Sequence, residues 1–199
     1  MISEKQLGDL IQQKLPLPGD AEGQQLFADG HLKNIGNSSV LVIIYFQKGN
    51  TPNIIFTKRS SKLRNHAGEI SFPGGRRCIN DNSLIDTAIR ETYEEIGLLI
   101  DKGNIVGCLD PTNTYTTKIQ IYPFVVILTE LTTALIPNEE VDEIIVIPLE
   151  KLIQSIEIDK VHSSRNQKMF KFSVGEHLIW GATARILKNL IEIVESPKQ

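Results

Sequence analysis

The segment from Ser38 to Phe46 constrains the fold of this chain more than any other. It consists of Ser-Ser-Val-Leu-Val-Ile-Ile-Tyr-Phe, so that it is almost entirely aliphatic or aromatic after its two serines. A strand with one face in water alternates apolar and polar side chains, whereas a strand buried on both faces has no need to alternate. We therefore expect a strand that lies inside a sheet and is covered on both sides.

Apolar spacing elsewhere in the chain predicts helices and further strands. Helical spacing predicts a helix over residues 2–14 that is capped by Ser3, another over 83–96 between a Ser83 cap and Gly97, and a last one over 182–194. Strands are predicted over residues 53–58, 105–109, 119–128 and 143–147. Strands on both sides of one central helix, followed by a terminal helix, predict an α/β or α+β fold in which a mixed β-sheet is sandwiched between α-helices.

Length and composition predict a single domain over residues 1–199. The 199 residues are 41% hydrophobic and 23% charged, which lies within the range of an ordinary globular domain. We find no internal repeat and no long linker, and the glycines within residues 19–37 favour loops there. The expected domain has an N-terminal helix at about 2–15 and a C-terminal helix at about 182–194, and it is a monomer or a homodimer.

Charge and cysteine content exclude several classes of protein. The 21 basic and 24 acidic residues leave a net charge of -3, which gives no electrostatic footprint for nonspecific binding to nucleic acid. No apolar run approaches the ~20 residues needed to span a bilayer, and no signal peptide is expected. Cys78 and Cys108 are too few for a disulfide scaffold and lack C-x-x-C spacing. We expect a cytoplasmic protein that binds neither nucleic acid nor membrane.

Three glutamates lie within the helix predicted over 83–96. Glu91, Glu94 and Glu95 stand at i, i+3 and i+4 and therefore share one face of the helix. An exposed helix face is the ordinary explanation for such a cluster. However, the turn Phe72-Pro73-Gly74-Gly75 precedes Glu91, and its glycines let the backbone approach a ligand or metal closely. Because repelling carboxylates suit hard divalent cations, we predict a site for Mg²⁺ or Mn²⁺ and phosphate.

The segment from Gly75 to Leu98 resembles the Nudix box, G-x5-E-x7-R-E-U-x-E-E-x-G-U, in which U is aliphatic. The matching residues are Arg90, Glu91, Glu94, Glu95, Gly97 and Leu98. The stretch from Gly75 to Arg90 is one residue longer than the pattern, Asp81 or Asn82 stands in place of the first glutamate, and Thr92 replaces an aliphatic residue. The resemblance implies a Nudix fold and the hydrolysis of a nucleoside diphosphate derivative.

A second signature resembles the R-S-x3-R-x3-G-x3-F-P-G-G pattern of coenzyme A pyrophosphatases. Its fixed positions are all present, at Arg59-Ser60, Arg64, Gly68 and 72–75, and residues 179–184 are also similar to that subfamily. The implied substrate is coenzyme A or a derivative, cleaved to 3',5'-ADP and a phosphopantetheine fragment. ADP-ribose or another nucleoside diphosphate derivative is the alternative substrate, because a Nudix box reports only the diphosphate chemistry. A nucleotide-binding module without catalysis is the alternative class.

The resemblance also implies roles for the box residues. The metal ligands would be Glu91, Glu94 and Glu95. The alternative role for Glu91 is to orient or deprotonate the attacking water, because members of the family differ in this respect. Arg90 belongs to the catalytic set because it would pair with a carboxylate and fix the helix geometry. Metal ions neutralise phosphate oxygens and lower the pKa of bound water, so that no protein nucleophile is required.

The substrate-binding residues implied by the second signature are Arg59, Arg64, Gly74 and Gly75. Arginine makes bidentate contacts to phosphate, and coenzyme A carries an additional phosphate on its ribose. For other polar residues of this part of the chain, and for a second acidic cluster, the sequence leaves two explanations open. Lys58 and Lys62 are phosphate contacts or solvated charges, His66 is more often a packing or hydrogen-bonding residue than a base, and Glu139, Glu140 and Glu143 form an exposed turn after Pro137 or supply a late catalytic carboxylate.

Overall fold

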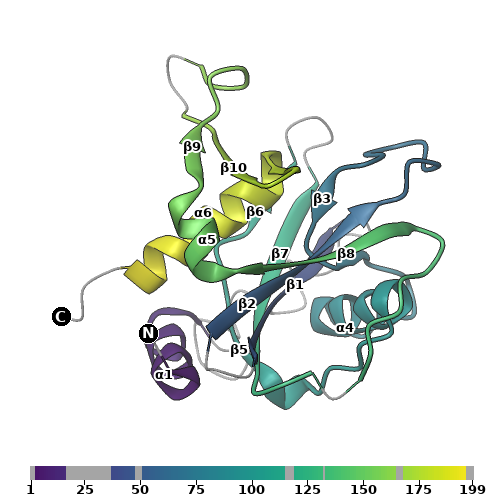
Figure 1. Ribbon diagram of the computed structural model, residues 1–199. Helices are drawn as coiled ribbons and strands as arrows, with labels where there is room; N and C mark the ends of the chain where they lie inside the picture. Colours follow the sequence, from purple (N-terminus) through teal and green to yellow (C-terminus); the bar gives the residue numbers. More distant parts are fainter. Residues whose placement is uncertain are drawn as a thin grey trace.

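A computed structural model of the chain describes residues 3–16, 37–47, 51–114, 119–131, 133–164 and 168–195. The loop prediction for residues 19–37 therefore falls outside the described residues except at Asn37. Within the described part, the elements follow one another as shown in Figure 1. They are α1 (Glu4–Lys14), β1 (Ser38–Gln47), β2 (Thr51–Arg59), β3 (Ile70–Ser71), β4 (Gly74–Arg76), α4 (Leu84–Ile96), the 3-10 helix η1 (Lys102–Asn104), β5 (Ile105–Cys108), β6 (Thr112–Asn113), β7 (Gln120–Leu128), β8 (Val141–Pro148), α5 (Leu149–Gln154), β9 (Ile156–Ile158), β10 (Phe170–Val174), β11 (His177–Ile179) and α6 (Gly181–Glu195).

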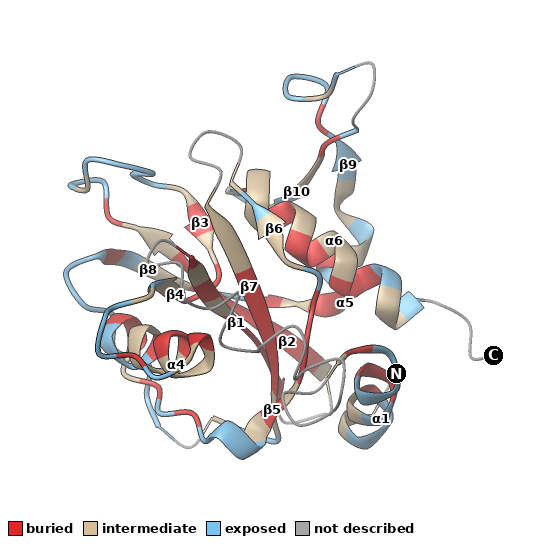
Figure 2. Ribbon diagram, turned by 180° about the vertical axis from the view of Figure 1, so that it is seen from behind, coloured by how far each residue is buried: buried red, intermediate tan, exposed pale blue. Residues whose placement is uncertain are grey.

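Strand β1 lies in the middle of the larger sheet and is buried on both faces, as Figure 2 shows. Val42 and Ile44 point into one apolar cluster, whereas Leu41 and Ile43 point into the other. All four side chains are fully buried, because successive residues of a strand face opposite sides of its sheet. The double burial predicted for residues 38–46 is confirmed.

The larger sheet is mixed. Strand β1 pairs in parallel with β7 and antiparallel with β2, and β8 pairs antiparallel with β2. The short strands β3, β4 and β6 extend these ladders through β2, β1 and β7 respectively. A smaller sheet has the order β11-β10-β9, and its Phe172 and Ile179 belong to the same buried cluster as one face of β1.

Helices cover both faces of the larger sheet. On one face α4 contributes Leu84, Ala88 and Ile96 to a buried cluster. On the other face α1, α5 and α6 pack around a second cluster, and Figure 2 shows α4 and α1 on opposite sides of the strands. The predicted sandwich of a mixed sheet between helices is confirmed. No helix of the described residues is both long enough and apolar enough to cross a membrane.

The helix ends follow the predicted caps. Ser3 and Gln6 form a reciprocal capping box at the start of α1. The Ser83 hydroxyl accepts a hydrogen bond from the Asp86 backbone N–H at 3.1 Å, and Gly97 ends α4 in the left-handed conformation with φ 70°. These two caps set where the box helix begins and ends.

Two regions differ from the sequence prediction. The segment from Arg59 to Gly75, in which no strand was predicted, begins at the last residue of β2 and contains β3 and part of β4. Residues 149–179 hold α5 and the smaller sheet, none of which was predicted. The alternation of Phe170 and Phe172, followed by Gly175 at φ 60°, is the pattern that could have indicated a hairpin there.

Candidate active site

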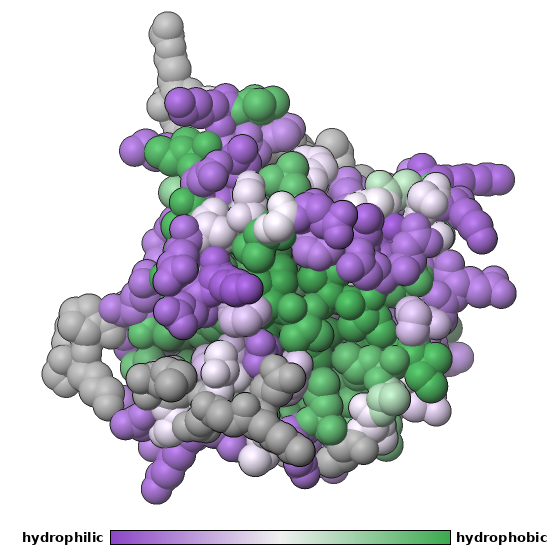
Figure 3. Space-filling view, viewed as in Figure 1, coloured by the Kyte–Doolittle hydropathy of each residue, from purple (hydrophilic) through white to green (hydrophobic). Residues whose placement is uncertain are grey.

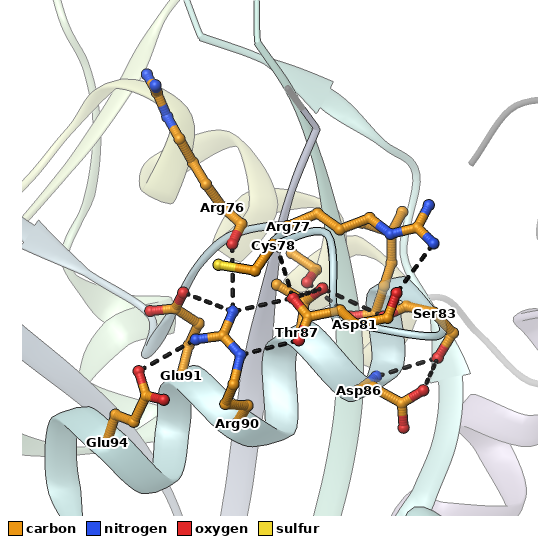
Figure 4. A network of polar contacts seen from close by, with 12 residues as sticks. Arg76, Arg77, Cys78, Asp81, Ser83, Asp86, Thr87, Arg90, Glu91 and Glu94 are labelled. Atoms are coloured by element: carbon orange, nitrogen blue, oxygen red, sulfur yellow. Dashed lines mark hydrogen bonds and ion pairs between the residues drawn. The ribbon is translucent and has the colours of Figure 1, made fainter. Parts of the chain in front are cut away.

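Arg90 lies at the centre of a polar network on α4 (Figure 4). Its Nε and Nη2 atoms donate to the two carboxylate oxygens of Asp81, both at 2.9 Å. Nη1 donates to Glu94 at 3.1 Å, and Nη2 lies 2.9 Å from a Glu91 oxygen. The hydrogen bonds to Asp81 are the main reason that the pKa of Arg90 is raised. The pairing predicted for Arg90 is present, and it fixes the guanidinium against the helix.

Asp81 supplies the carboxylate at the place where the box pattern has its first glutamate. Besides Arg90, it accepts hydrogen bonds from the Thr87 hydroxyl at 2.9 Å and from the Cys78 backbone N–H at 2.8 Å. Hydrogen bonding from Arg90 is the chief cause that lowers the pKa of Asp81 to about 2. Asn82 is exposed, whereas Asp81 is buried and held by these hydrogen bonds. Of the two residues, Asp81 is therefore the one that takes the place of the first glutamate. Because the hydrogen-bond partners of Asp81 are residues of the protein itself, its role is structural.

The three glutamates of α4 lie in different environments although they share a helix face. Glu94 has an exposed side chain, at 53%, whereas Glu95 is only 4% exposed. Burial raises the pKa of Glu95 to about 7, and its Oε2 accepts a hydrogen bond from the Gly74 backbone N–H at 3.1 Å. Glu91 is partly buried, and its pKa is also raised by burial. Glu95 is therefore the least neutralised of the three carboxylates.

The two glycines of the turn are required by contacts within the protein. Gly74 has φ 141°, and a Cβ atom there would lie 2.3 Å from the Ser39 carbonyl oxygen. A Cβ atom on Gly75 would lie 2.5 Å from the Glu91 carboxylate. The glycines thus let β4 approach β1 and the box helix, and the close approach to a ligand that we predicted for them stays a prediction.

Arg59 and Glu140 join this site from two other segments. The positive charge of Arg59, at the end of β2, acts to lower the pKa of Glu95, and the negative charge of Glu140 acts to raise it. The Nε atom of Arg59 is buried and has no hydrogen-bond partner among the residues that the structure describes. The Glu140 carbonyl accepts from the Ser60 backbone N–H at 2.8 Å, and the Asn138 backbone N–H donates to the Glu95 carbonyl at 2.9 Å. These bonds hold the turn that carries Glu140 between β2 and α4.

The remaining polar candidates are exposed or have other partners. Arg64, Lys62 and His66 are exposed in the loop after β2, and the His66 ring lies 3.0 Å from the Glu69 carboxylate, as expected for a hydrogen-bonding residue. The second acidic cluster is divided: Glu139 and Glu140 lie in an exposed turn, whereas Glu143 lies on β8. Glu143 is 4.0 Å from Lys58, which belongs to β2 and lies within the strand predicted over residues 53–58.

The carboxylates do not converge on one point in this arrangement. Within the described residues, no three His, Cys, Asp or Glu side chains are grouped so that they could hold one ion. Glu91 and Glu94 turn toward Arg90, and Glu95 turns toward Gly74. Their chemistry nevertheless fits Mg²⁺ or Mn²⁺, because both ions prefer oxygen ligands and Glu95 is a buried carboxylate with little neutralising charge. Side-chain rotation of these glutamates would be needed to share a metal ion.

Comparison with known proteins shows the family to which the chain is similar. A family model described as NUDIX domain matches residues 37–169. The chain is 33% identical over 166 residues to the mitochondrial coenzyme A diphosphatase NUDT8 of Homo sapiens, covering 79% of this chain and 69% of that protein. It is 33% identical over 152 residues to the uncharacterized Nudix hydrolase NudL of Pectobacterium atrosepticum, covering 74% of this chain and 78% of that protein.

A solved structure extends the similarity over nearly the whole chain. The crystal structure of a MutT/nudix family protein from Enterococcus faecalis superposes with a TM-score of 0.56 at 16% identity, covering 98% of this chain and 76% of that one. At this identity the superposition supports the arrangement of helices and strands alone.

Proposed function

The chain belongs to the Nudix hydrolase family, and we propose that it hydrolyses the pyrophosphate bond of coenzyme A or a derivative with the help of Mg²⁺ or Mn²⁺. The products would be 3',5'-ADP and 4'-phosphopantetheine, or the acylated form of the latter. Water attacks one phosphorus atom, the anhydride P–O bond breaks, and the bridging oxygen leaves with the other phosphate.

The observation that carries this proposal is that the buried carboxylate of Glu95 lies within electrostatic reach of Arg59. Arg59 belongs to the signature that resembles coenzyme A pyrophosphatases, and Glu95 belongs to the Nudix box. That the charge of Arg59 acts to lower the pKa of Glu95 supports a single site built from both signatures. Two coenzyme A diphosphatases, from human and mouse, are among the relatives, at 33% and 35% identity, which supports coenzyme A as the substrate.

Each side chain has a role that its surroundings support. Glu91, Glu94 and Glu95 would hold the metal ions, which supply positive charge to the phosphate oxygens and a water of lowered pKa. Arg90, held by Asp81, keeps Glu91 and Glu94 in position on the helix. Glu140 faces the same carboxylates and is, with Glu91, a candidate to accept the proton of the attacking water.

Arg59 and Arg64 differ in burial and in position, which suggests that they contact different phosphate groups. Arg59 is half-buried next to Glu95 and would contact the scissile diphosphate. Arg64 is exposed in the loop after β2, where it can reach a more distant group such as the 3'-phosphate. Arginine suits both, because its planar guanidinium binds phosphate in a bidentate manner.

Product analysis tests the proposal. The purified chain is incubated with coenzyme A, 3'-dephospho-coenzyme A and ADP-ribose, with Mg²⁺, with Mn²⁺ or with a chelator, and the products are separated by chromatography. We expect metal-dependent release of 3',5'-ADP from coenzyme A at the highest kcat/KM of the panel. A preference for ADP-ribose would contradict the coenzyme A assignment, and no cleavage of any compound would indicate a nucleotide-binding module.

A further inference from the structure

An aromatic pair lies outside the site described above and has no part in it. The rings of His162 and Trp180 are stacked, with their centroids 5.1 Å apart and their planes inclined by 19°. His162 follows β9, and Trp180 stands between β11 and the first residue of α6. Two residues that are 18 positions apart in the sequence thus lie ring against ring, so that each ring has one face toward the other and one face turned away from it.

The imidazole of His162 is held in place by a buried carboxylate. Asp159 lies 2.6 Å from His162 Nδ1 and accepts hydrogen bonds from the backbone N–H groups of Val161 at 3.0 Å and His162 at 3.2 Å. Asp159 is itself fixed, because its backbone N–H donates to the Met169 carbonyl at 2.8 Å. The ring is therefore oriented before any ligand arrives, which lowers the entropic cost of stacking on it.

The pair is exposed to solvent. Trp180 is 37% exposed, and the His162 side chain is 50% exposed. Nearby residues of the smaller sheet and its loop, Ile158, Val161 and Leu178, are also exposed although they are apolar. An aromatic pair that served only the core would be covered, whereas this one presents apolar surface to the solvent.

The smaller sheet adjoins the strands that lead to the candidate active site. Strand β11, which runs directly into Trp180, packs against β3, and β3 runs into the turn that contains Gly74 (Figure 1). His177 at the start of β11 lies 3.8 Å from Glu143, which in turn lies 4.0 Å from Lys58, the neighbour of Arg59. Figure 3 shows apolar surface gathered in the middle of the face that this view presents, with hydrophilic side chains around it. The aromatic pair is thus connected to the candidate active site through β11 and its neighbour β3.

We propose that Trp180 and His162 form a stacking platform for the adenine ring of the nucleotide substrate. This inference rests on the proposed function, since it assumes a substrate with a purine base attached to the scissile diphosphate. A purine has two flat π faces, and stacking on an aromatic side chain recognises them without hydrogen bonds to the base edges. The platform would hold the nucleoside end while the glutamates of α4 act on the diphosphate.

A binding experiment tests the platform without any turnover. Trp180 is the only tryptophan of the chain, so that its fluorescence reports on this position alone. The metal-free chain is titrated with 3',5'-ADP and, separately, with inorganic pyrophosphate, which has no base. We expect saturable quenching by 3',5'-ADP and none by pyrophosphate. We also expect His162→Ala to weaken the binding of 3',5'-ADP by about 5- to 150-fold, the range for loss of one stacking contact.

Matched variants separate stacking from a structural role. Trp180→Leu should raise KM for coenzyme A at least about 5-fold with little change in kcat, whereas Trp180→Phe, which keeps a ring, should restore most of the affinity. Leu178→Ala, an exposed apolar residue of β11 outside the ring pair, should change neither constant. Equal losses for Trp180→Leu and Trp180→Phe would overturn the stacking role.

The outcomes distinguish this inference from the proposed function. If coenzyme A is hydrolysed while 3',5'-ADP binds without altering the fluorescence, the platform is wrong and the function stands. If no compound of the panel is hydrolysed but adenine nucleotides quench the fluorescence, the platform stands and the function is wrong. Equal quenching by pyrophosphate and 3',5'-ADP would show a response to phosphate alone and would also overturn the platform.

Discussion

Two parts of the box helix, α4, differ in how their charged side chains are neutralised. Around Arg90, the carboxylates of Asp81, Glu91 and Glu94 surround one guanidinium at 2.9 to 3.1 Å, so that each charge has a partner. At the next helical position, Glu95 is buried with the Gly74 N–H as its hydrogen-bond donor. In the first part, charges of the protein neutralise one another without a ligand. In the second part, the carboxylate of Glu95 has little positive charge near it. A buried group that the protein leaves poorly neutralised calls for an explanation, and a bound cation is the simplest.

Removing the box carboxylates that are proposed as metal ligands should have the largest effect. Glu95→Gln and Glu91→Gln should each lower kcat/KM more than about 100-fold, because loss of a metal ligand should exceed the 10 to 100-fold typical of residues around it. Both proteins should fold, and Mn²⁺ affinity measured by calorimetry should fall with activity. Glu150→Gln, at an exposed glutamate of α5, controls for the change of charge. Near-normal activity in both variants would remove these residues from the site.

The two signature arginines should differ in their effect on substrate choice. A hydrogen bond to a charged group is worth about 1.5 to 3 kcal/mol, or roughly 10- to 150-fold in kcat/KM. Arg59→Ala should cause a loss of this size on coenzyme A and on its 3'-dephospho form alike. Arg64→Ala should cause it on coenzyme A alone, and the ratio of kcat/KM values on the two substrates measures the difference. Equal losses for Arg64→Ala on both substrates would refute recognition of the 3'-phosphate.

Breaking the paired part should affect stability first. Asp81→Ala removes the bidentate partner of Arg90 and leaves a half-buried guanidinium with Glu91 and Glu94. We expect a loss of about 2 to 3 kcal/mol in the free energy of unfolding, somewhat below the cost of breaking a fully buried ion pair. Urea denaturation measures the loss, and Asn82→Ala at the exposed neighbouring position is the control. Equal stability in both variants would mean that the network contributes nothing to folding.

The pH dependence of stability should separate the two parts. The folded-state pKa of Glu95 is about 7, above its ordinary 4.5, so the stability that its protonated form contributes is complete below pH 4.5 and is lost as the pH rises through 7. Asp81 behaves oppositely: with a pKa of about 2, its contribution is present above pH 3.8 and is lost only as the pH falls toward 2.

Between pH 7.5 and 5.5, therefore, Glu95 should respond and Asp81 should not. The metal-free chain should gain about 1 to 2 kcal/mol over this range, which corresponds to a rise in Tm of about 2 to 8 °C. Glu95→Gln should reduce this gain, whereas Asp81→Asn should leave it intact. Thermal unfolding in the presence of a chelator measures both, and a Tm that does not change with pH in the parent chain would contradict the burial of a titrating Glu95.

The smallest expected effect concerns Thr92, an uncharged polar residue on the same helix. Thr92 is fully buried, and its hydroxyl has no hydrogen-bond partner within the described part of the chain. Thr92→Val should stabilise the protein by about 1 kcal/mol, since it removes an unsatisfied buried hydroxyl. Thr87→Val is the matched control: that hydroxyl donates toward Asp81 and the Ser83 carbonyl, so its loss should destabilise. Destabilisation by both changes would show that Thr92 has a partner after all.

Local signals in the sequence determined the main elements of the fold. The unbroken apolar run of β1, the Ser83 cap and the Gly97 stop of α4 each act within a few residues, because helix caps and strand burial depend on neighbouring positions. The i, i+3, i+4 spacing of the box glutamates is local in the same sense. These features were predicted correctly, and they place the candidate site on its helix.

The tertiary structure decided what local patterns do not encode. Strands as short as β3 and β4 carry too few residues for a periodic signal, and they form because β2 and β1 offer partners from far along the chain. The burial of Glu95, and the effect of the Arg59 and Glu140 charges on its pKa, likewise depend on three segments that come together only when the chain folds. Sequence gives each side chain its chemistry, but burial and the distance between charges set its pKa and its partners, and these arise from contacts between remote segments.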